Sequence, residues 1–530
     1  MNREQALAHL RSGEPVDVLV VGGGIAGAGV ALEAARAGAR VALVEARDFA
    51  SGTSSRSSKL VHGGLRYIAH GQWQLTRESV RERDALLRHS AGLVRPLRFV
   101  LPVREGDRKG RAMLGVGLAL YDGFAGRRTR GWHPAPELLA CVPPLHATGL
   151  RGGWSYEDAQ TDDARLVLRV LAEARRHGAL TLNHVAVDTL LRGPGGVQGA
   201  RLTDAVSGQG FELAAGCVVN ATGAWADTLR AGVGRAPGLR PLRGSHLLLP
   251  AWRLPLAQAV ALFHPEDGRP VFALPWEGRT LVGTTDIDHR DGLADEPAIT
   301  AAELRYLLRA LQAQFPALGL AAKDVLSTWS GVRPVVASGK AVAPSAEPRE
   351  HLVVAEEGLI TVTGGKLTTF RATALQALRL AAQKVSALRR LDPAAPVFAP
   401  MARGDTAVLD RLPVPLAQRW RARFGPDAVH VAAGVRGGEL DPVPGTDVAW
   451  AELRWACEAE AVVHLDDLLL RRTRLGLLLP HGAAACLPRV KAIVQQTLGW
   501  SDTHWAAEVA RYQARVARSH GVPGTESEAR

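Results

Sequence analysis

Apolar residues near the start of the chain come in short runs that are separated by glycines. The first run, residues 16–21, predicts a buried β-strand, and the glycine-rich segment 22–27 follows it at once. An alanine-rich stretch with helical spacing comes next, and a second apolar run covers residues 40–44. The succession of strand, helix and strand predicts a βαβ unit, which is the building block of a parallel sheet.

The spacing of apolar residues predicts further elements along the chain. Helical spacing predicts helices at residues 72–89, 113–121, 161–177 and 370–388, and at the charged segment 451–474. Apolar runs predict strands at residues 180–190, 217–220 and 359–363. Residues 243–290 and 325–336 alternate apolar and polar positions between Gly and Pro residues, which is typical of an antiparallel sheet.

The first glycine turn has the spacing of a dinucleotide-binding site. Gly22 would allow the tight turn, Gly24 would let the backbone approach a pyrophosphate, and Gly27 would let helix and strand pack closely. The N–H groups and the dipole of a helix N-terminus favour phosphate binding at such a turn. Glu45 follows the second strand, at the distance expected of an acid that accepts hydrogen bonds from a ribose. The pattern predicts bound FAD or NAD, and therefore redox chemistry.

The length and the element pattern predict several domains. With 530 residues, the chain is long enough for about two or three. We expect an α/β fold in which residues 1–390 form a Rossmann-type nucleotide-binding domain with an interleaved antiparallel-sheet substrate domain. The substrate domain is expected at roughly residues 70–155 and 230–345. A proline-rich linker at 392–400 would then lead to a C-terminal helical domain, residues 401–530.

The chain is strongly basic, with a net charge of +12 and a pI of about 10.1. Nucleic acid, an anionic membrane surface, an anionic substrate and a solvated arginine-rich surface all fit such a charge. An RNA-associated flavoprotein would interleave aromatic and basic residues. Aromatic residues make up only 5% of the chain, and the basic stretches 104–111 and 127–130 lack such interleaving. The sequence therefore predicts no nucleic-acid partner.

The four cysteines lie far apart and form no CxxC pair, which argues against a zinc site or a disulfide framework and fits a reducing cytoplasm. Residues 1–14 are polar, so we expect no signal peptide. The apolar stretches 113–120 and 475–479 are too short to cross a bilayer, and we expect a soluble or peripheral protein. No metal-ligand spacing is present, and we expect no metal.

Seven segments, in this order, resemble the FAD-dependent glycerol-3-phosphate dehydrogenases. They are residues 53–67, 162–166, 220–223, 243–246, 283–286, 330–334 and 364–369. The resemblance covers residues 15–390 well and is looser beyond, where residues 451–453 and 467–474 carry it. It implies a glutathione-reductase-like FAD-binding fold, FAD rather than NAD, and oxidation of sn-glycerol 3-phosphate to dihydroxyacetone phosphate. It also implies ubiquinone or menaquinone as acceptor and peripheral binding to the inner face of the cell membrane, and we expect a homodimer.

A substrate with a phosphate dianion needs a cationic pocket, for which the planar fork of Arg is well suited. By resemblance, the phosphate end is contacted by Arg66, Tyr67, Thr284 and Lys366, and Arg333 faces the reacting end. Arg349 is a further expected phosphate contact. The predicted catalytic residues are His62, Arg66, Arg333 and Lys366.

His62 is the candidate proton acceptor, because the ordinary pKa of histidine lies near working pH. By resemblance it lies near the flavin ring, where its alternative role is to orient or cover the isoalloxazine. His246 and His289 are expected to be structural.

The residues expected to hold FAD come from five parts of the chain. They are Gly22, Gly24, Gly27 and Glu45; Thr53, Ser54 and Ser55; Val185; Ala221 and Gly223; and Gly365, Lys366, Leu367 and Thr368. The last four are expected to open the helix at 370–388.

Two other flavoenzymes stay open as alternatives. One is a glycerol-3-phosphate oxidase that passes electrons to oxygen. Oxidase relatives often carry an inserted segment, and none is obvious here. The other is an oxidase of the sarcosine or amino-acid type, against which the several phosphate-suited cations argue.

Overall fold

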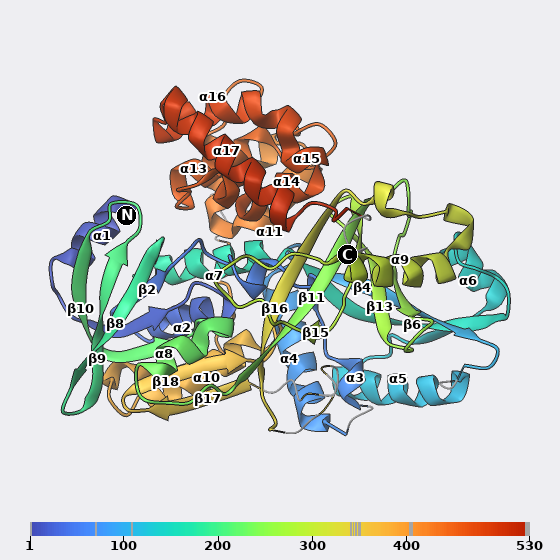
Figure 1. Cartoon of the computed structure of the whole chain (residues 1–530), viewed down its shortest axis with the longest axis horizontal. Coiled ribbons are helices and arrows are strands. Elements are labelled where there is room, and N and C mark those ends of the chain that lie inside the picture. The colour runs from blue at the N-terminus through green and yellow to red at the C-terminus, as the bar shows by residue number, and fades with distance from the viewer. Residues whose placement is uncertain are drawn as a thin grey trace, which may run out of the picture.

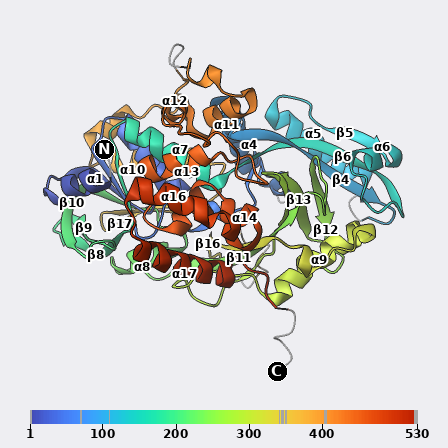
Figure 2. The ribbon, with the colours of Figure 1, turned by 90° about the horizontal axis from the view of Figure 1, so that it is seen from above.

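The structure is a computed structural model that describes residues 3–68, 71–107, 110–339, 342, 344, 347, 351–401 and 406–524. The side chains of Arg66 and Tyr67, and all of Arg349, lie outside this description. Two β-sheets lie side by side, and a helical C-terminal domain lies above the region between them (Figure 1, Figure 2). This architecture confirms the predicted α/β class with a helical C-terminal domain.

The first sheet contains the predicted βαβ unit and has eight strands. They are β1 (Val16–Val21), β2 (Val41–Glu45), β7 (Leu180–Asn183), β8 (Val185–Gly193), β9 (Gly196–Asp204), β10 (Gly210–Asn220), β17 (His351–Glu356) and β18 (Leu359–Gly364). The main path is β17-β18-β10-β1-β2-β7, with β1 parallel to both β10 and β2. The carboxyl ends of these parallel strands therefore meet at one edge of the sheet.

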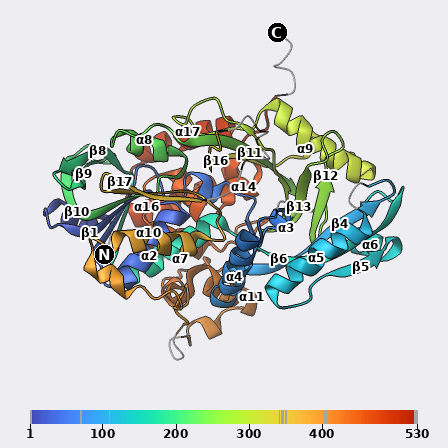
Figure 3. The same cartoon turned by 90° about the horizontal axis from the view of Figure 1, so that it is seen from below.

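Both faces of the first sheet are covered. Helices α2 (Ile25–Arg36), α7 (Asp163–Arg176) and α10 (Phe370–Ala381) pack on one face (Figure 3). The other face carries α1 (Arg3–Arg11), α8 (Ala226–Ala231) and the hairpin β8–β9. Val18 and Val20 of β1 lie in the first core, and Leu19 and Val21 lie in the second. A parallel strand buried on both faces is nearly continuously apolar, and residues 16–21 have this pattern except at Asp17.

The second sheet has ten strands. They are β3 (Leu60–Val61), β4 (Val94–Arg104), β5 (Gly131–Pro134), β6 (Leu150–Thr161), β11 (Leu239–Pro250), β12 (Ala259–Phe263), β13 (Pro270–Trp276), β14 (Arg279–Gly283), β15 (Ile287–Asp288) and β16 (Ser327–Val336). The pair β4–β12 is parallel, and the pairs around it are antiparallel. Leu247 and Leu249 of β11 enter one core, and Leu248 enters the other, as the alternating pattern predicts.

Helices cover the second sheet on both sides. The helices α6 (Ala135–Cys141) and α9 (Ala301–Gln314) pack on one face. The other face receives α4 (Trp73–His89) and α5 (Arg111–Ala125), with the short α3 (Leu65–Ile68) beside them. Residues 72–89 were thus predicted to within one residue, whereas the helix around 113–121 is longer at both ends.

The described part of the C-terminal domain is mainly helical. Its helices are α11 (Val414–Phe424), α12 (Ala428–Ala433), α13 (Trp450–Ala459), α14 (Leu475–Leu478), α15 (Pro480–Ala483), α16 (Leu487–Leu498) and α17 (Asp502–Ser519). Leu468 and Leu475 share one hydrophobic core with Trp276 and Trp329 of the second sheet. The domain is therefore packed onto the sheet rather than tethered to it.

Three further predicted elements have different boundaries. The helix predicted at 161–177 begins at Asp163, because Thr161 still belongs to β6 and the Asp162 side chain caps the helix by accepting from Arg165 N at 3.2 Å. The strand predicted at 180–190 is broken at His184, which adopts a left-handed φ of 55°. The single helix predicted at 451–474 ends at Ala459, and a wider π-helical turn covers Asp467–Arg472.

The last helix of the nucleotide-binding region is shorter than predicted. α10 begins at Phe370, with Thr369 as its N-cap, and ends at Ala381 rather than at Leu388. Residues Gly365–Thr368 therefore precede the helix and do not open it, which corrects the expectation. Gly364 and Gly365 both have positive φ (74° and 73°), and this turns the chain out of β18 before the helix starts.

Candidate active site

The glycine turn after β1 is as tight as the sequence predicts. Gly22 has φ 113°, and a Cβ there would lie 2.5 Å from the carbonyl oxygen of Ala221. A Cβ on Gly27 would lie 1.9 Å from the carbonyl oxygen of Gly22. Neither position has room for a side chain. At Gly24 the nearest atom would be Ser54 Oγ, at 3.2 Å, so the turn opens toward the segment 53–59.

The start of α2 fits the phosphates of a dinucleotide. Within the described part of the chain, no acceptor binds the N–H groups of Ala26 and Gly27. Ile25 N donates to Ser54 Oγ at 3.0 Å, so the segment that follows β2 lies against the same helix end. Free N–H groups at a helix N-terminus bind pyrophosphate oxygens well. The residues present therefore fit FAD at this position.

Glu45 ends β2 and is fixed by the backbone. Its Oε2 accepts from Gly23 N at 2.7 Å, and its Oε1 accepts from Arg47 N at 2.9 Å. Burial raises the pKa of the Glu45 carboxyl, and the two N–H donors oppose that rise. A carboxylate has about four acceptor sites, so two bonds leave capacity for a ribose.

The other residues expected on the nucleotide side lie at the same sheet edge. Ala221 N donates to Val21 O at 2.8 Å, and Gly223 O accepts from Thr363 Oγ1 at 3.0 Å. Val185 begins β8 and is buried. The residue before it, His184, donates its N–H to Arg47 O at 2.7 Å, which places Val185 beside the Glu45 loop.

The loop before α10 is joined to the segment that carries His62. Thr368 Oγ1 lies 3.2 Å from His62 N and 3.3 Å from His62 O, with a hydrogen bond to each. This contact links residues that are 306 positions apart in the sequence. It brings His62 together with the loop of Gly365, Lys366 and Leu367.

Lys366 is half-buried and reaches from this loop to α4. Its Nζ donates to Ser79 Oγ at 2.7 Å. Burial lowers the pKa of Lys366 to about 7, although the nearby carboxylates of Asp158 and Glu78 favour its charged form. Because the pKa of Lys366 lies near neutral pH, an anion that binds beside the side chain favours its protonated form.

Arg333 is held where three of the recognised motifs meet. Its guanidinium donates to Thr284 Oγ1 and to Asp286 Oδ1, both at 3.1 Å. It lies directly over Gly244, where a Cβ would come within 2.3 Å of it. The side chain remains 27% exposed. The motifs at 243–246 and 330–334 lie on the paired strands β11 and β16, and the motif at 283–286 begins at the last residue of β14.

His246, on β11 of the second sheet, contacts the segment before His62. The ring is buried, lies 2.8 Å (Nε2) from Ser58 Oγ, and stacks on Trp329 with centroids 5.3 Å apart. Burial lowers the pKa of His246 well below its usual value, and the cations Arg333 and Lys59 lower it further. His246 therefore acts as a neutral link between the two parts of the site.

One group near the site was missed by the sequence reasoning. Asp158 is buried in β6, and its Oδ1 accepts from Gly63 N at 3.1 Å, Arg83 at 2.9 Å and Tyr121 OH at 2.8 Å. It thus fixes the residue after His62. An acidic residue within an apolar strand could have marked Asp158 as a candidate. Its side-chain partners lie on α4 and α5, however, and no local sequence pattern identifies them.

Three of the expected substrate contacts are not located. The side chains of Arg66 and Tyr67 and all of Arg349 fall outside the described residues, so their roles stay predictions. Arg66 and Tyr67 belong to α3, which begins shortly after His62 and Gly63 in the sequence.

Among the residues that the structure describes, Asp48, His184 and Asp467 place potential metal ligands within 4.8 Å of one another. Arginines already neutralise this group. Arg472 donates to both oxygens of Asp48, at 2.5 and 2.7 Å, and Arg471 donates to Asp48 and Asp467. The cluster is therefore a set of ion pairs between the C-terminal domain and the segment that follows β2.

Two family profiles match the chain. The family described as FAD dependent oxidoreductase matches residues 17–371, and the C-terminal domain of alpha-glycerophosphate oxidase matches residues 362–505. The chain is 37% identical over 391 residues to the aerobic glycerol-3-phosphate dehydrogenase of Staphylococcus saprophyticus, covering 73% of this chain and 70% of that protein. It is 35% identical over 541 residues to the glycerol-3-phosphate dehydrogenase of Mycobacterium leprae, covering 97% and 90%.

Solved structures show the same fold. The glycerol-3-phosphate dehydrogenase from Bacillus halodurans, complexed with FAD, has a TM-score of 0.74 and 28% identity, and the match covers 97% of this chain and 96% of that one. The L-alpha-glycerophosphate oxidase from Mycoplasma pneumoniae, with FAD bound, has a TM-score of 0.58 and 18% identity, over 74% of this chain and 100% of that one. The second likeness shows the fold alone.

Proposed function

Because this chain belongs to the FAD-dependent glycerol-3-phosphate dehydrogenases, we propose that it oxidises sn-glycerol 3-phosphate to dihydroxyacetone phosphate and passes the electrons to a membrane quinone. The observation that carries the proposal is the contact between Thr368 and His62. That contact joins the segment of His62 to the loop of Lys366. The pKa of Lys366 is about 7, so the binding of an anion would favour its protonated form.

When bound, FAD accepts the hydride that leaves C2 of the substrate. The remaining work belongs to the side chains of the chain itself. We assign His62 the proton of the C2 hydroxyl, which passes to an imidazole nitrogen as the ketone forms. Hydride and proton together account for the two hydrogens lost between alcohol and ketone. Asp158 acts on this step indirectly, because it holds the N–H of Gly63.

We assign the phosphate dianion to Lys366 and to the other residues that the resemblance predicts at this end. Lys366 supplies a point charge from the loop before α10, and Arg66, Tyr67, Thr284 and Arg349 remain proposed partners of the same end. Arg333 is assigned to the reacting end, where Asp286 and Thr284 orient its fork. A zwitterionic amine would not need so many cations, and this argues against an amino-acid-type oxidase.

An enzyme that reduces a lipid-borne quinone must approach the bilayer, and α5 offers a surface suited to this. Met113, Val116 and Leu120 share one face of the helix and are 54%, 62% and 42% exposed. Trp73, at the start of α4, is 46% exposed and lies 6.3 Å from the ring of Phe124. Exposed apolar residues on one face of a helix are typical of a helix that lies in a membrane interface.

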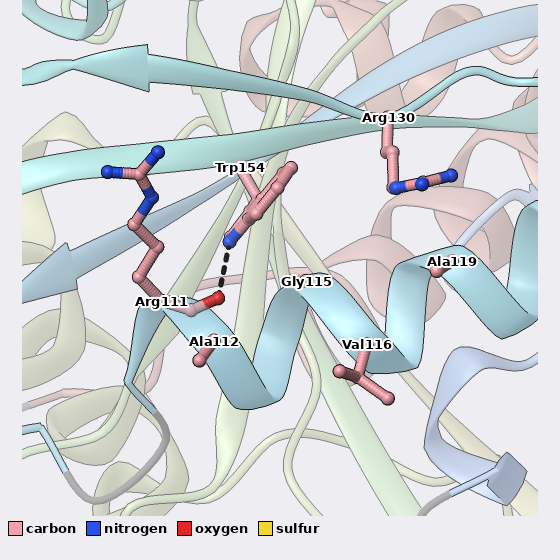
Figure 4. Close-up of a pocket in the computed structure, with 7 residues that line it drawn as sticks. All are labelled: Arg111, Ala112, Gly115, Val116, Ala119, Arg130 and Trp154. Atoms are coloured by element: carbon pink, nitrogen blue, oxygen red, sulfur yellow. Dashed lines mark hydrogen bonds between the residues drawn. The ribbon is translucent and has the colours of Figure 1, made fainter.

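Arginines border this surface. A groove of about 540 Å³ runs along α5 between Arg111 and Arg130, and Trp154 forms its wall with Nε1 donating to Arg111 O at 2.9 Å (Figure 4). The helix lies on the side of the molecule opposite the C-terminal domain (Figure 1, Figure 3). Within the described part of the chain, no helix has both the length and the apolar character needed to cross a bilayer. We therefore propose peripheral association through α5 with an anionic membrane surface on the cytoplasmic side.

The proposed activity is tested by following product and acceptor together. The purified enzyme, given sn-glycerol 3-phosphate and a soluble quinone in air, should form dihydroxyacetone phosphate in step with quinol, with little peroxide. Peroxide formed in step with product, with the quinone unused, would instead identify the alternative, an oxidase. A homodimer also remains a proposal, and the mass of the purified protein in solution tests it.

A further inference from the structure

The C-terminal domain meets the FAD-binding domain through buried arginines. Arg471 and Arg472 lie on the π-helical turn, and Arg474 follows it with a left-handed φ of 64°. Their exposed fractions are 3%, 0% and 1%. Buried charges are costly unless they are paired, so the partners of these three residues define what the turn holds.

Arg471 and Arg472 hold the segment that follows Glu45. Both donate to the carboxylate of Asp48, and Arg472 does so with both arms of its fork. The backbone of the same segment is tied to the glycine turn, because Ala50 N donates to Gly23 O at 3.0 Å. The arginine pair thus supports the loop that follows Glu45, the expected ribose acceptor.

Arg474 holds the second loop, residues 53–59. Its guanidinium donates to Asp162 Oδ1 at 3.0 Å from Nε, to Asp163 Oδ1, and to the carbonyl oxygen of Ser55 at 3.4 Å. Asp163 in turn accepts from Ser57 N at 3.0 Å and from Ser57 Oγ at 2.7 Å. One side chain of the C-terminal domain therefore reaches the loop both directly and through a carboxylate.

Lys59, the last residue of this loop, completes the arrangement. It is fully buried, and its Nζ donates to Ser55 O at 2.6 Å and to both oxygens of Asp163 at 2.8 and 2.9 Å. The ammonium also lies 4.8 Å from the ring centroid of Trp329, a favourable cation–π distance. Arg474 and Lys59 thus share the same two acceptors, Asp163 and Ser55 O.

The loop itself has little apolar anchorage. Its sequence, residues 53–59, is Thr-Ser-Ser-Arg-Ser-Ser-Lys, so hydrogen bonds and ion pairs fix its position. Its contact with the cofactor region is Ser54 Oγ, which accepts from the first N–H of α2. A displacement of Ser55 would therefore move Ser54 at the helix end where the pyrophosphate is expected.

We propose that Arg474, acting with Lys59 through Asp163 and Ser55, is a positioning residue for FAD, and that the turn 467–474 is the part of the C-terminal domain that keeps the cofactor loops in place. Arg474 does not touch the reacting atoms. Its role concerns how long FAD stays bound, and it is independent of which substrate or acceptor the enzyme uses.

The test is the rate of FAD release from the full-length holoenzyme, followed as the rise of flavin fluorescence after dilution. Arg474→Met should release FAD about tenfold faster than the unsubstituted protein, equivalent to about 1.4 kcal/mol. Lys59→Met should do the same. Because the two residues share Asp163 and Ser55 O as acceptors, the effects of the two substitutions should not simply multiply in the double variant.

A matched control separates cofactor positioning from general stability. Arg454 is also buried in the C-terminal domain and is paired with Glu439 through two Nε contacts of 2.9 Å, away from both loops. Arg454→Met should lower the unfolding temperature as Arg474→Met does, without changing FAD release. Unchanged release in Arg474→Met, equal acceleration in Arg454→Met, or multiplying effects in the double variant would each overturn the proposal.

A conservative variant covers the case in which Arg474→Met does not fold. Arg474→Lys keeps the positive charge but loses the fork that bridges Asp162 and Asp163. It is expected to fold and to release FAD faster than the unsubstituted protein. Release at the unsubstituted rate would count against the proposal in the same way.

Discussion

At the scale of single residues, the site depends on cations whose surroundings set their state. Arg333 is oriented by Thr284 and Asp286. Lys366 is different, because burial lowers its pKa to about 7 and leaves only part of the population charged at neutral pH. A phosphate dianion binds the protonated form, so substrate and proton should bind together.

This coupling predicts a pH dependence. The charged form of Lys366 is lost as pH rises through about 7, so kcat/KM for glycerol 3-phosphate should fall above that pH, by up to tenfold per unit. Lys366→Arg keeps its charge throughout, and its profile should stay flat to higher pH. Steady-state profiles with soluble quinone measure both. An alkaline limb at the same pH in the Lys366→Arg enzyme would assign that limb to another group.

At the scale of elements, the apolar pattern of the chain predicts the helices and strands whose formation depends on local sequence. The βαβ unit and α4 follow from apolar spacing and from the glycine turn. The break after Ala459 and the π-helical turn did not follow, because the turn is held by Asp48, Asp162 and Asp163, more than 300 residues away. Residues 451–474 combine apolar and charged residues at helical spacing. Without knowledge of those partners, this pattern predicts one long helix.

The same limit applies to the candidate site. Motif order predicts Lys366 and His62 as site residues. Their link through Thr368 and the hydrogen bond from Lys366 to Ser79 depend on how β3, β18 and α4 meet, which no local pattern gives. The start of α10 was misplaced, because two glycines with positive φ delay the helix to Phe370.

The surface of α5 makes a prediction of its own. Replacing Met113 and Val116 together by Glu should weaken binding to vesicles of anionic lipid by at least about tenfold, since apolar burial is lost and repulsion is added. Val414→Glu is the control, because Val414 is 66% exposed but lies on α11 in the C-terminal domain. Co-sedimentation measures binding. Equal loss in the control, or no loss in the α5 variant, would rule out α5 as the docking surface.

At the scale of the whole molecule, two sheets and a helical domain are joined around one set of loops. The first sheet supplies the glycine turn and Glu45, and the second supplies Arg333 and Asp158. The C-terminal domain shares a core with the second sheet and ion pairs with the first. Function at the loops between them therefore depends on all three parts being packed together.

Oxidation of glycerol 3-phosphate by the FAD-bound protein can be followed in the visible spectrum during an anaerobic titration. We expect sn-glycerol 3-phosphate to bleach the flavin band, and glycerol and glycine to leave it unchanged. A flavin band that glycerol 3-phosphate leaves unchanged, or that glycine bleaches, would rule out this substrate.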